Sequence, residues 1–246
     1  MSGDAPWRLL GTPRKGGVLV VSDHAGCAVP EDIGLGIDPA LLRQHIAVDL
    51  GVAEVAARLA ELGCAAFVSR YSRLVCDLNR EEHAPSLIPI ASDGHAIPGN
   101  AIDHAAHEAR RARFFHPYHG ALALLLEEMP PGLILSLHSF TPQLAMHPDE
   151  ARPWQVGVLY NHDDRAARIA LPLLEGEGLV VGDQQPYSGQ ALNYTMNRHA
   201  EAAGRPYLGV EVRQDEISDA AGQAIWAERL ARVCEQVVRG LIDPLR

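Results

Sequence analysis

The sequence of 246 residues predicts a single-domain, three-layer α/β/α fold built on a mostly parallel mixed sheet. Two observations support this class. Short, continuous apolar runs alternate with longer segments whose apolar residues recur at helical spacing, as in parallel strands covered by helices on both faces. A hydrophobic content of 47% is enough for one sizeable core, so we expect one domain over residues 1–246.

The first predicted element is a buried strand at residues 17–22, where a glycine pair leads into an apolar run. Asp38 and Pro39 have the pattern of a helix N-cap followed by proline at the first helical position. Residues 49–62 show apolar positions at helical spacing and end before a glycine, which predicts a helix. Residues 64–69 form the next predicted strand.

A further short strand is expected at residues 74–76, followed by a long loop over residues 81–100 that is rich in proline and glycine. Residues 103–128 have the pattern of a helix that is bent or interrupted at Pro117. The rest of the chain alternates between strands and helices. The predicted strands are 132–137, 155–160, 179–182 and 207–212, and the predicted helices are 164–175, 191–203 and 218–239.

Four polar side chains lie at or just past predicted strand ends: His24, Asp77, His138 and Glu211. In open α/β sheets, ligands bind beyond the carboxyl ends of the strands. We therefore expect these four residues to meet on one rim of the sheet. Their chemistry indicates a hydrolytic metal site.

A catalytic zinc site uses about three nitrogen or oxygen ligands and leaves one position open. His24 and His138 come from separate strand ends, which suits ligands that converge on one point. Asp49 is our choice for the third ligand, because the start of a helix is a rigid platform. Glu31, in the loop after His24, is the alternative.

Glu211 is then available as the general base. Arg73, Asn79 and Arg80 are candidates for holding an anionic group, since the planar fork of arginine matches a carboxylate. Asp77 either orients one of these arginines or anchors backbone amides in a turn.

Some of these polar residues also fit purely structural roles. Glu211 and Arg213 alternate with valines, as they would on the polar face of an edge strand. His104 and His107 lie at neighbouring helical positions that could hold a metal, although a solvated helix face accounts for them better. Serine-hydrolase and phosphate-loop motifs are absent from the sequence.

Composition restricts the partners. The net charge of -10 argues against a nucleic acid or an anionic membrane as partner, but a local arginine cluster still permits an anionic substrate. The four cysteines form no CxxC pair, and we interpret them as reduced thiols of a cytoplasmic protein. We see neither a signal peptide nor an apolar run of the length, about 20 residues, that a membrane span needs.

Several motifs occur in an order and at spacings that are specific when taken together. They are Ser-Asp-His-Ala-Gly at 22–26, Asp49, Ser-Arg-Leu-Val-Cys-Asp-Leu-Asn-Arg at 72–80, Pro-Tyr-His at 117–119, Leu-His-Ser-Phe at 137–140, Pro-Tyr-Ser-Gly at 186–189 and Gly-Val-Glu-Val-Arg at 209–213. In these motifs the chain resembles the N-formylglutamate amidohydrolase family over most of its length. That family is distantly similar to zinc carboxypeptidases and aspartoacylases, which implies a zinc-carboxypeptidase-like fold.

The resemblance implies a role for each matching residue. His24 and His138 become Zn²⁺ ligands, and Glu211 becomes the general base. Arg73 polarises the scissile carbonyl, and Asn79 with Arg80 forms the clamp on the substrate carboxylate. Further substrate-binding residues from the matching motifs are Asp77, His119, Tyr187 and Arg213.

The chain departs from the pattern in two places. Cys27 stands three residues after His24, where the related enzymes have glutamate, so the third ligand is open among Asp49, Glu31 and Cys27. Glutamines 184 and 185 stand where an acidic residue is expected, which bears on the side-chain pocket.

The expected function is release of formate or a small acyl group from an anionic N-acyl amino acid, as in amino-acid catabolism. One alternative is a carboxypeptidase-like hydrolase of a peptide or peptidoglycan fragment. Another is a metal-free binding protein of the same fold. Glu211 and both histidines are present together, which favours an enzyme.

Overall fold

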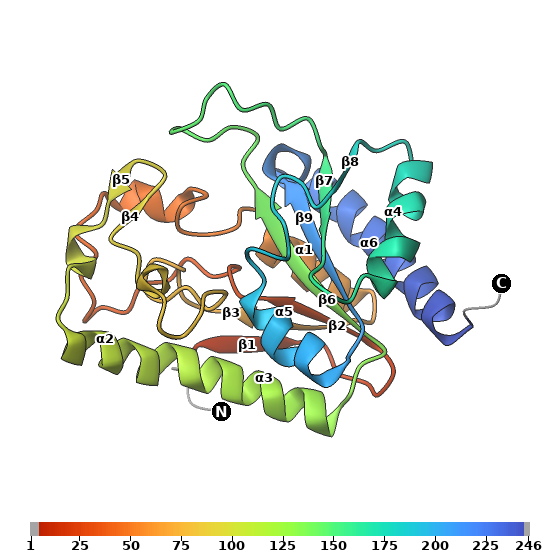
Figure 1. Ribbon diagram of the computed structural model, residues 1–246, viewed down its shortest axis with the longest axis horizontal. Coiled ribbons are helices and arrows are strands. Elements are labelled where there is room, and N and C mark those ends of the chain that lie inside the picture. The colour runs from red at the N-terminus through yellow and green to blue at the C-terminus, as the bar shows by residue number, and fades with distance from the viewer. Residues whose placement is uncertain (1–4, 244–246) are drawn as a thin grey trace.

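The computed structural model describes residues 5–243. Its centre is a seven-stranded sheet in the order β1-β3-β2-β6-β9-β7-β8 (Figure 1). The strands are β1 (Trp7–Leu10), β2 (Val18–Ser22), β3 (Ala65–Ser69), β6 (Leu133–Phe140), β7 (Val156–Leu159), β8 (Val181–Asp183) and β9 (Tyr207–Arg213). β3, β2, β6 and β9 are parallel, whereas β1 runs antiparallel to β3 and β7 runs antiparallel to β9. The predicted single-domain fold with a mostly parallel mixed sheet is confirmed.

Helices cover both faces of this sheet (Figure 1). On one face, α1 (Val52–Glu61), α4 (Arg165–Gly176) and α6 (Ala220–Ile242) pack against alternate strand residues to form the larger core. On the other face, α3 (His116–Glu128) and α5 (Tyr194–His199) cover a second core. The sheet is therefore buried on both sides, which accounts for its apolar strands.

Strand alternation decides which way the site residues point. Val210 and Val212 belong to the core beneath α1, α4 and α6, so Glu211 between them points to the opposite face. β9 lies between β6 and β7 rather than at an edge. Glu211 is thus not part of a solvent-facing edge, and the edge-strand interpretation is wrong.

Several element boundaries differ from the prediction. Residues 74–76 form a turn instead of a strand, and β1 was missed because its four residues are not continuously apolar. Residues 103–128 are helical almost throughout, as α2 (His104–Arg110), a π-helical segment (Arg111–Phe115) and α3. The π segment directly precedes the turn that holds Pro117, which cannot donate an amide hydrogen bond.

Two other predicted segments are more divided than expected. The predicted helix 191–203 is α5 followed by a short 3-10 turn (Glu201–Ala203). The long loop contains a small hairpin of β4 (Ala91–Ser92) and β5 (His95–Ala96).

Asp38 caps a 3-10 helix (Pro39–Arg43), its side chain accepting from the amide of Ala40. Among residues 5–243, no helix is long and apolar enough to cross a membrane.

Candidate active site

A cavity of about 430 Å³ opens beside the carboxyl ends of β6 and β9. His138 and Glu211 are register partners on these two strands, so their side chains leave the sheet next to each other. His24 follows the end of β2 and also lines the cavity. The residues that were expected on one rim therefore do share one cavity, with the exception of Asp77.

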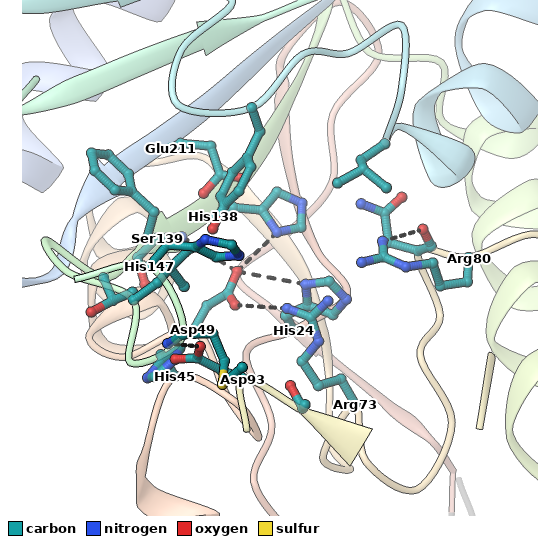
Figure 2. A pocket seen from close by; sticks show the side chains of 18 of the residues that line it. His24, His45, Asp49, Arg73, Arg80, Asp93, His138, Ser139, His147 and Glu211 are labelled. Carbon is teal, nitrogen blue, oxygen red and sulfur yellow. Dashed lines mark hydrogen bonds and ion pairs between the residues drawn. The ribbon is translucent and has the colours of Figure 1, made fainter. Parts of the chain in front are cut away.

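Asp49 lies between the two imidazoles (Figure 2). Its Oδ2 is 2.9 Å from Nδ1 of His138 and 3.6 Å from Nδ1 of His24. All three residues line the cavity, and each is less than a tenth exposed. Two imidazole nitrogens and one carboxylate oxygen thus face a common space that is open to substrate on one side.

The opposite edges of both rings face a second set of carboxylates. Nε2 of His24 is 2.7 Å from Oδ1 of Asp77, and Nε2 of His138 is 3.5 Å from Oδ1 of Asp23. Histidines that bind a metal commonly give their other ring nitrogen to a carboxylate, which sets the tautomer and the ring orientation. Asp77 occupies that orienting position for His24, whereas Asp23 approaches His138 at 3.5 Å without a hydrogen bond.

Among the described residues, Asp23, His24 and His138 form a group whose donor atoms all lie within 4.8 Å of one another, which offers a second possible metal position. Asp23 does not line the cavity, and an ion on its side of the rings would have no position open to substrate. A catalytic metal needs such an open position. We therefore favour the Nδ1 side, with His24, Asp49 and His138 as the ligands.

Charge balance supports a cation at this place. Asp23, Asp49 and Asp77 are all at most 4% exposed, and Arg73 is the cation that pairs closely with this group. With neutral imidazoles the three carboxylates outnumber the positive charges near them even when Arg80, 3.9 Å from Asp77, is counted with Arg73, and this excess is costly in a buried site. A divalent metal ion would offset it. Oδ1 of buried Asp23 has no hydrogen-bond partner among the described residues.

The same imbalance perturbs the histidines. Burial alone would lower the pKa of His138, but Asp23 and Asp49 outweigh it and raise this pKa to about 10. Burial and Arg73 likewise disfavour the charged form of His24, yet the surrounding carboxylates raise its pKa. The carboxylates around both rings thus favour a bound proton on each imidazole. A metal ion at the rings would supply positive charge in place of these protons.

Local sequence accounts for how these groups are positioned. Gly26 follows His24 where the chain passes so close to Arg70 that a β-carbon would lie 2.2 Å from the carbonyl of that residue. Gly51 has φ of 80° and ends the Asp49 segment before α1 begins, a conformation that favours glycine. Gly26 thus lets the His24 segment pass close to Arg70, and Gly51 lets the chain turn from Asp49 into α1 beside Ile217.

Arg73 is held in place by carboxylates. Its Nε and Nη2 donate to Oδ2 of Asp77 at 3.1 and 2.7 Å, and its Nη1 is 3.7 Å from Oδ1 of Asp49. The side chain of Ser72 stabilises the turn that carries it, accepting from the amide of Leu74 and donating to the carbonyl of Ala47. Arg73 therefore presents a fixed cation to the cavity.

Asn79 and Arg80 both line the cavity, and Arg80 lies on the far side of His24 from His45 and His147 (Figure 2). Asp77 forms the turn before them by accepting from the amide of Asn79 at 3.1 Å. Asp77 itself does not line the cavity. It orients His24, Arg73 and this turn, so the prediction that Asp77 binds substrate is corrected to a positioning role.

Glu211 is 9% exposed, lines the cavity, and lies beside His138. Burial raises its pKa to about 7, an effect that the neighbouring His138 partly offsets. A carboxyl group with a pKa near the working pH can both accept and return a proton. Its position and protonation behaviour suit a general acid–base role.

His119 does not reach the cavity. It is fully buried, its Nε2 lies 3.0 Å from the carbonyl of Leu78, and its Nδ1 lies 2.9 Å from Nε2 of His199. Since the carbonyl only accepts, His119 donates from Nε2 and accepts from His199 at Nδ1. Both ring nitrogens are occupied, so His119 is structural and its predicted role in substrate binding is wrong.

The side chain of Arg213 does not line the cavity either. Its guanidinium pairs with Asp215 at 2.7 Å and donates to the carbonyls of residues 152–154. It sits at the end of β9, two residues past Glu211, but does not line the cavity. The prediction that Arg213 binds substrate is therefore also wrong. Glu31 and Cys27, the alternative ligands, are exposed and lie outside the cavity.

Tyr187 does line the cavity, and Arg152, which the sequence analysis did not identify, holds it there. Arg152 is buried, donates to the Tyr187 hydroxyl at 3.0 Å, and lies over its ring at 5.1 Å. Sequence reasoning missed Arg152 because no pattern distinguishes it. Asp23 was likewise missed, although its place beside His24 in the sequence was a usable signal.

A second missed feature is the wall opposite Arg80 (Figure 2). Asp93, at the tip of the β4–β5 hairpin, accepts from His45 at 2.8 Å and from the amides of Ala145 and Met146 at 2.9 and 3.0 Å. One carboxylate thus joins three segments that are far apart in the sequence. His45, Asp93 and His147 line the cavity there.

Comparison with known proteins agrees with this architecture. A gene product of Agrobacterium tumefaciens has a solved structure that is similar at a TM-score of 0.90 and 30% identity, over 97% of this chain and 96% of that one. The N-formylglutamate amidohydrolase of Ralstonia eutropha JMP134 is similar at a TM-score of 0.76 and 18% identity, over 96% and 98% of the two chains. A bacteriophage poly-gamma-glutamate hydrolase shares the fold at a TM-score of 0.50 and 13% identity, over 98% and 93%.

No match was found among curated proteins. The family model described as N-formylglutamate amidohydrolase matches residues 16–218. That range includes every residue placed at the cavity above. The chain therefore belongs to the N-formylglutamate amidohydrolase family.

Proposed function

We propose that this protein is a zinc-dependent amidohydrolase that releases formate or a small acyl group from an N-acyl amino acid. The observation that carries the proposal is the meeting of His24, Asp49 and His138 at one cavity with Glu211 beside them. Membership in the family supports amide hydrolysis. The arginines of the cavity support a small anionic substrate.

His24, Asp49 and His138 would hold the metal, with Asp77 orienting the ring of His24 and Asp23 lying 3.5 Å from the ring of His138. Zinc, when bound, supplies Lewis acidity that activates water and polarises a carbonyl oxygen. The remaining chemistry belongs to the side chains of the cavity.

Glu211 accepts a proton from the attacking water and returns it to the leaving nitrogen, which its pKa near 7 permits. Arg73, fixed by Asp77, offers its positive charge to the oxygen on which negative charge develops. Arg80 and Asn79 bind the substrate carboxylate. The carbon–nitrogen bond breaks, the hydroxyl of water joins the acyl carbon, and a free amino acid leaves with its new proton.

The test combines metal analysis with a substrate screen. Purified protein is expected to contain one zinc per chain and to release free amino acid from N-formyl or N-acetyl amino acids. Removing the metal with a chelator should abolish release, and adding zinc back should restore it. Full activity in protein shown to be free of metal would contradict the zinc dependence. Failure to hydrolyse any N-acyl amino acid would contradict the proposed reaction.

A further inference from the structure

We propose that the cavity selects N-acyl amino acids whose side chain is uncharged, and that Leu192 sets this preference. This inference rests on the proposed function. It names the substrate class more narrowly by asking how many substrate carboxylates the cavity can bind.

One arginine of the cavity is available to bind a substrate carboxylate. Arg73 and Arg80 are the arginines that line it in the part of the chain that the structure describes. Arg73 is engaged by Asp77 at 2.7 Å and by Asp49 at 3.7 Å. Arg80 is less committed, because its Nε is 3.9 Å from Asp77 and its Nη1 donates to a backbone carbonyl. One substrate carboxylate can therefore be matched by Arg80.

A second substrate carboxylate would lie near negatively charged side chains of the cavity. Asp49, Asp93 and Glu211 also line the cavity. On the wall opposite Arg80, His45 is already paired with Asp93 at 2.8 Å, so any charge it carries is matched. His147 also lines this wall. A buried carboxylate that lacks a partner is strongly unfavourable, and like charges nearby add to the cost.

Apolar side chains occupy the space beside the clamp. Leu192 lines the cavity and is 39% exposed, so its surface is open to a ligand. Its segment is joined to the clamp, since the amide of Thr195 donates to Oδ1 of Asn79 at 3.0 Å. The side chain of an amino acid branches from the carbon that carries the carboxylate. A substrate held at Arg80 therefore directs its side chain to the vicinity of Leu192.

Other apolar residues that line the cavity are Phe140, Leu144, Met146 and Leu159. An apolar substrate side chain gains by covering such surface, whereas a carboxylate loses its hydration there.

The decisive comparison uses N-formylglutamine and N-formylglutamate, which have the same shape and differ in one charge. Activity is measured at pH 8, where ordinary histidines are neutral, with N-formylleucine as the apolar reference. We expect kcat/KM for the glutamine and leucine compounds to exceed that for the glutamate compound by at least about tenfold. Calorimetric binding of the same three compounds to the Glu211→Gln protein should show the same order without turnover.

The variant Leu192→Arg supplies the missing cation and should raise the glutamate-to-glutamine ratio of kcat/KM at least about tenfold. Leu124→Arg is the matched control, since Leu124 is 60% exposed on α3 and lies outside the cavity. The control should leave the ratio unchanged.

Each outcome has a distinct meaning. Equal or faster hydrolysis of N-formylglutamate by the unmodified protein would overturn the inference and leave the proposed function intact. An unchanged ratio in a folded Leu192→Arg protein would remove Leu192 from the assignment. Failure of all three compounds and of their N-acetyl counterparts to react would instead overturn the proposed function.

Discussion

Replacing Glu211 with glutamine tests the proposed mechanism most directly. Glutamine preserves the size and shape of the side chain, but it cannot accept a proton from water. General acid–base groups contribute about 10²- to 10⁴-fold to rates. We therefore expect kcat to fall by that factor while the zinc content stays the same, because Glu211 is not among the proposed ligands.

The same substitution has a predictable effect on stability. Burial raises the pKa of Glu211 from 4.5 to about 7. The difference of roughly 2.5 units corresponds to about 3 kcal/mol at 1.36 kcal/mol per unit. Because the pKa is higher in the folded state, protonated Glu211 contributes to the free energy of unfolding. This stabilising contribution is fully present below about pH 4.5 and is lost as the pH rises through about 7.

At pH 8 the ionised Glu211 therefore destabilises the metal-free fold, and glutamine does not. The metal-free Glu211→Gln protein should be more stable than the unmodified one at pH 8, by at most about 3 kcal/mol. The difference should shrink towards pH 5. A gain in stability together with a loss of turnover is the expected signature of a buried catalytic carboxyl group.

The assay measures kcat, zinc content and the free energy of unfolding of the metal-free protein at pH 5 and pH 8. Glu127→Gln is a matched control, since Glu127 is exposed on α3. Near-normal turnover in Glu211→Gln would refute the catalytic role. Lower stability at pH 8 would show instead that Glu211 makes a stabilising ion pair.

Three further predictions concern metal, substrate and pH. His24→Ala should lose bound zinc as measured by elemental analysis, whereas His162→Ala, at an exposed position, should retain it; undiminished zinc in the first variant would exclude His24 as a ligand. Arg80→Ala should lower kcat/KM for a carboxylate-bearing substrate, mainly through KM, by an amount equivalent to about 2–4 kcal/mol. Exposed Arg168→Ala is its control, and an unchanged kcat/KM in Arg80→Ala would remove the clamp. Burial, assisted by neighbouring arginines, lowers the pKa of His199 to about 4, so the stabilising contribution of the neutral ring is present above about pH 6.5 and is lost as the pH falls towards 4. In His199→Gln the free energy of unfolding should therefore depend less steeply on pH between 6.5 and 4, and a slope identical to that of the unmodified protein would contradict the lowered pKa.

Much of the fold was predictable because local sequence carries its physical signal. Continuous apolar runs at β2, β3 and β6 are what a strand buried on both faces requires, and the spacing in α1 and α6 is that of a helix with one buried side. The four-residue β1 escaped prediction because a short edge strand has no such run. Residues 74–76 were assigned wrongly, because a buried apolar turn resembles a short strand.

At the site, the sequence by itself determined which residues come to the rim. His138 and Glu211 follow from strand ends in a parallel sheet, where position along the strand decides position in space. Asn79 and Arg80 follow from motifs carried by one short segment. These inferences needed only local order and chain direction.

Tertiary structure alone decided how those residues divide their roles. Asp49, Asp23 and Asp77 are chemically equivalent in the sequence, and only packing shows that Asp49 faces the cavity while the other two lie behind the histidines. His119 pairs with His199 across 80 residues. Asp93 meets Ala145 across 52 residues and shapes the wall opposite the clamp. Such contacts join segments that no periodicity connects, because they depend on where loops meet once the sheet has formed.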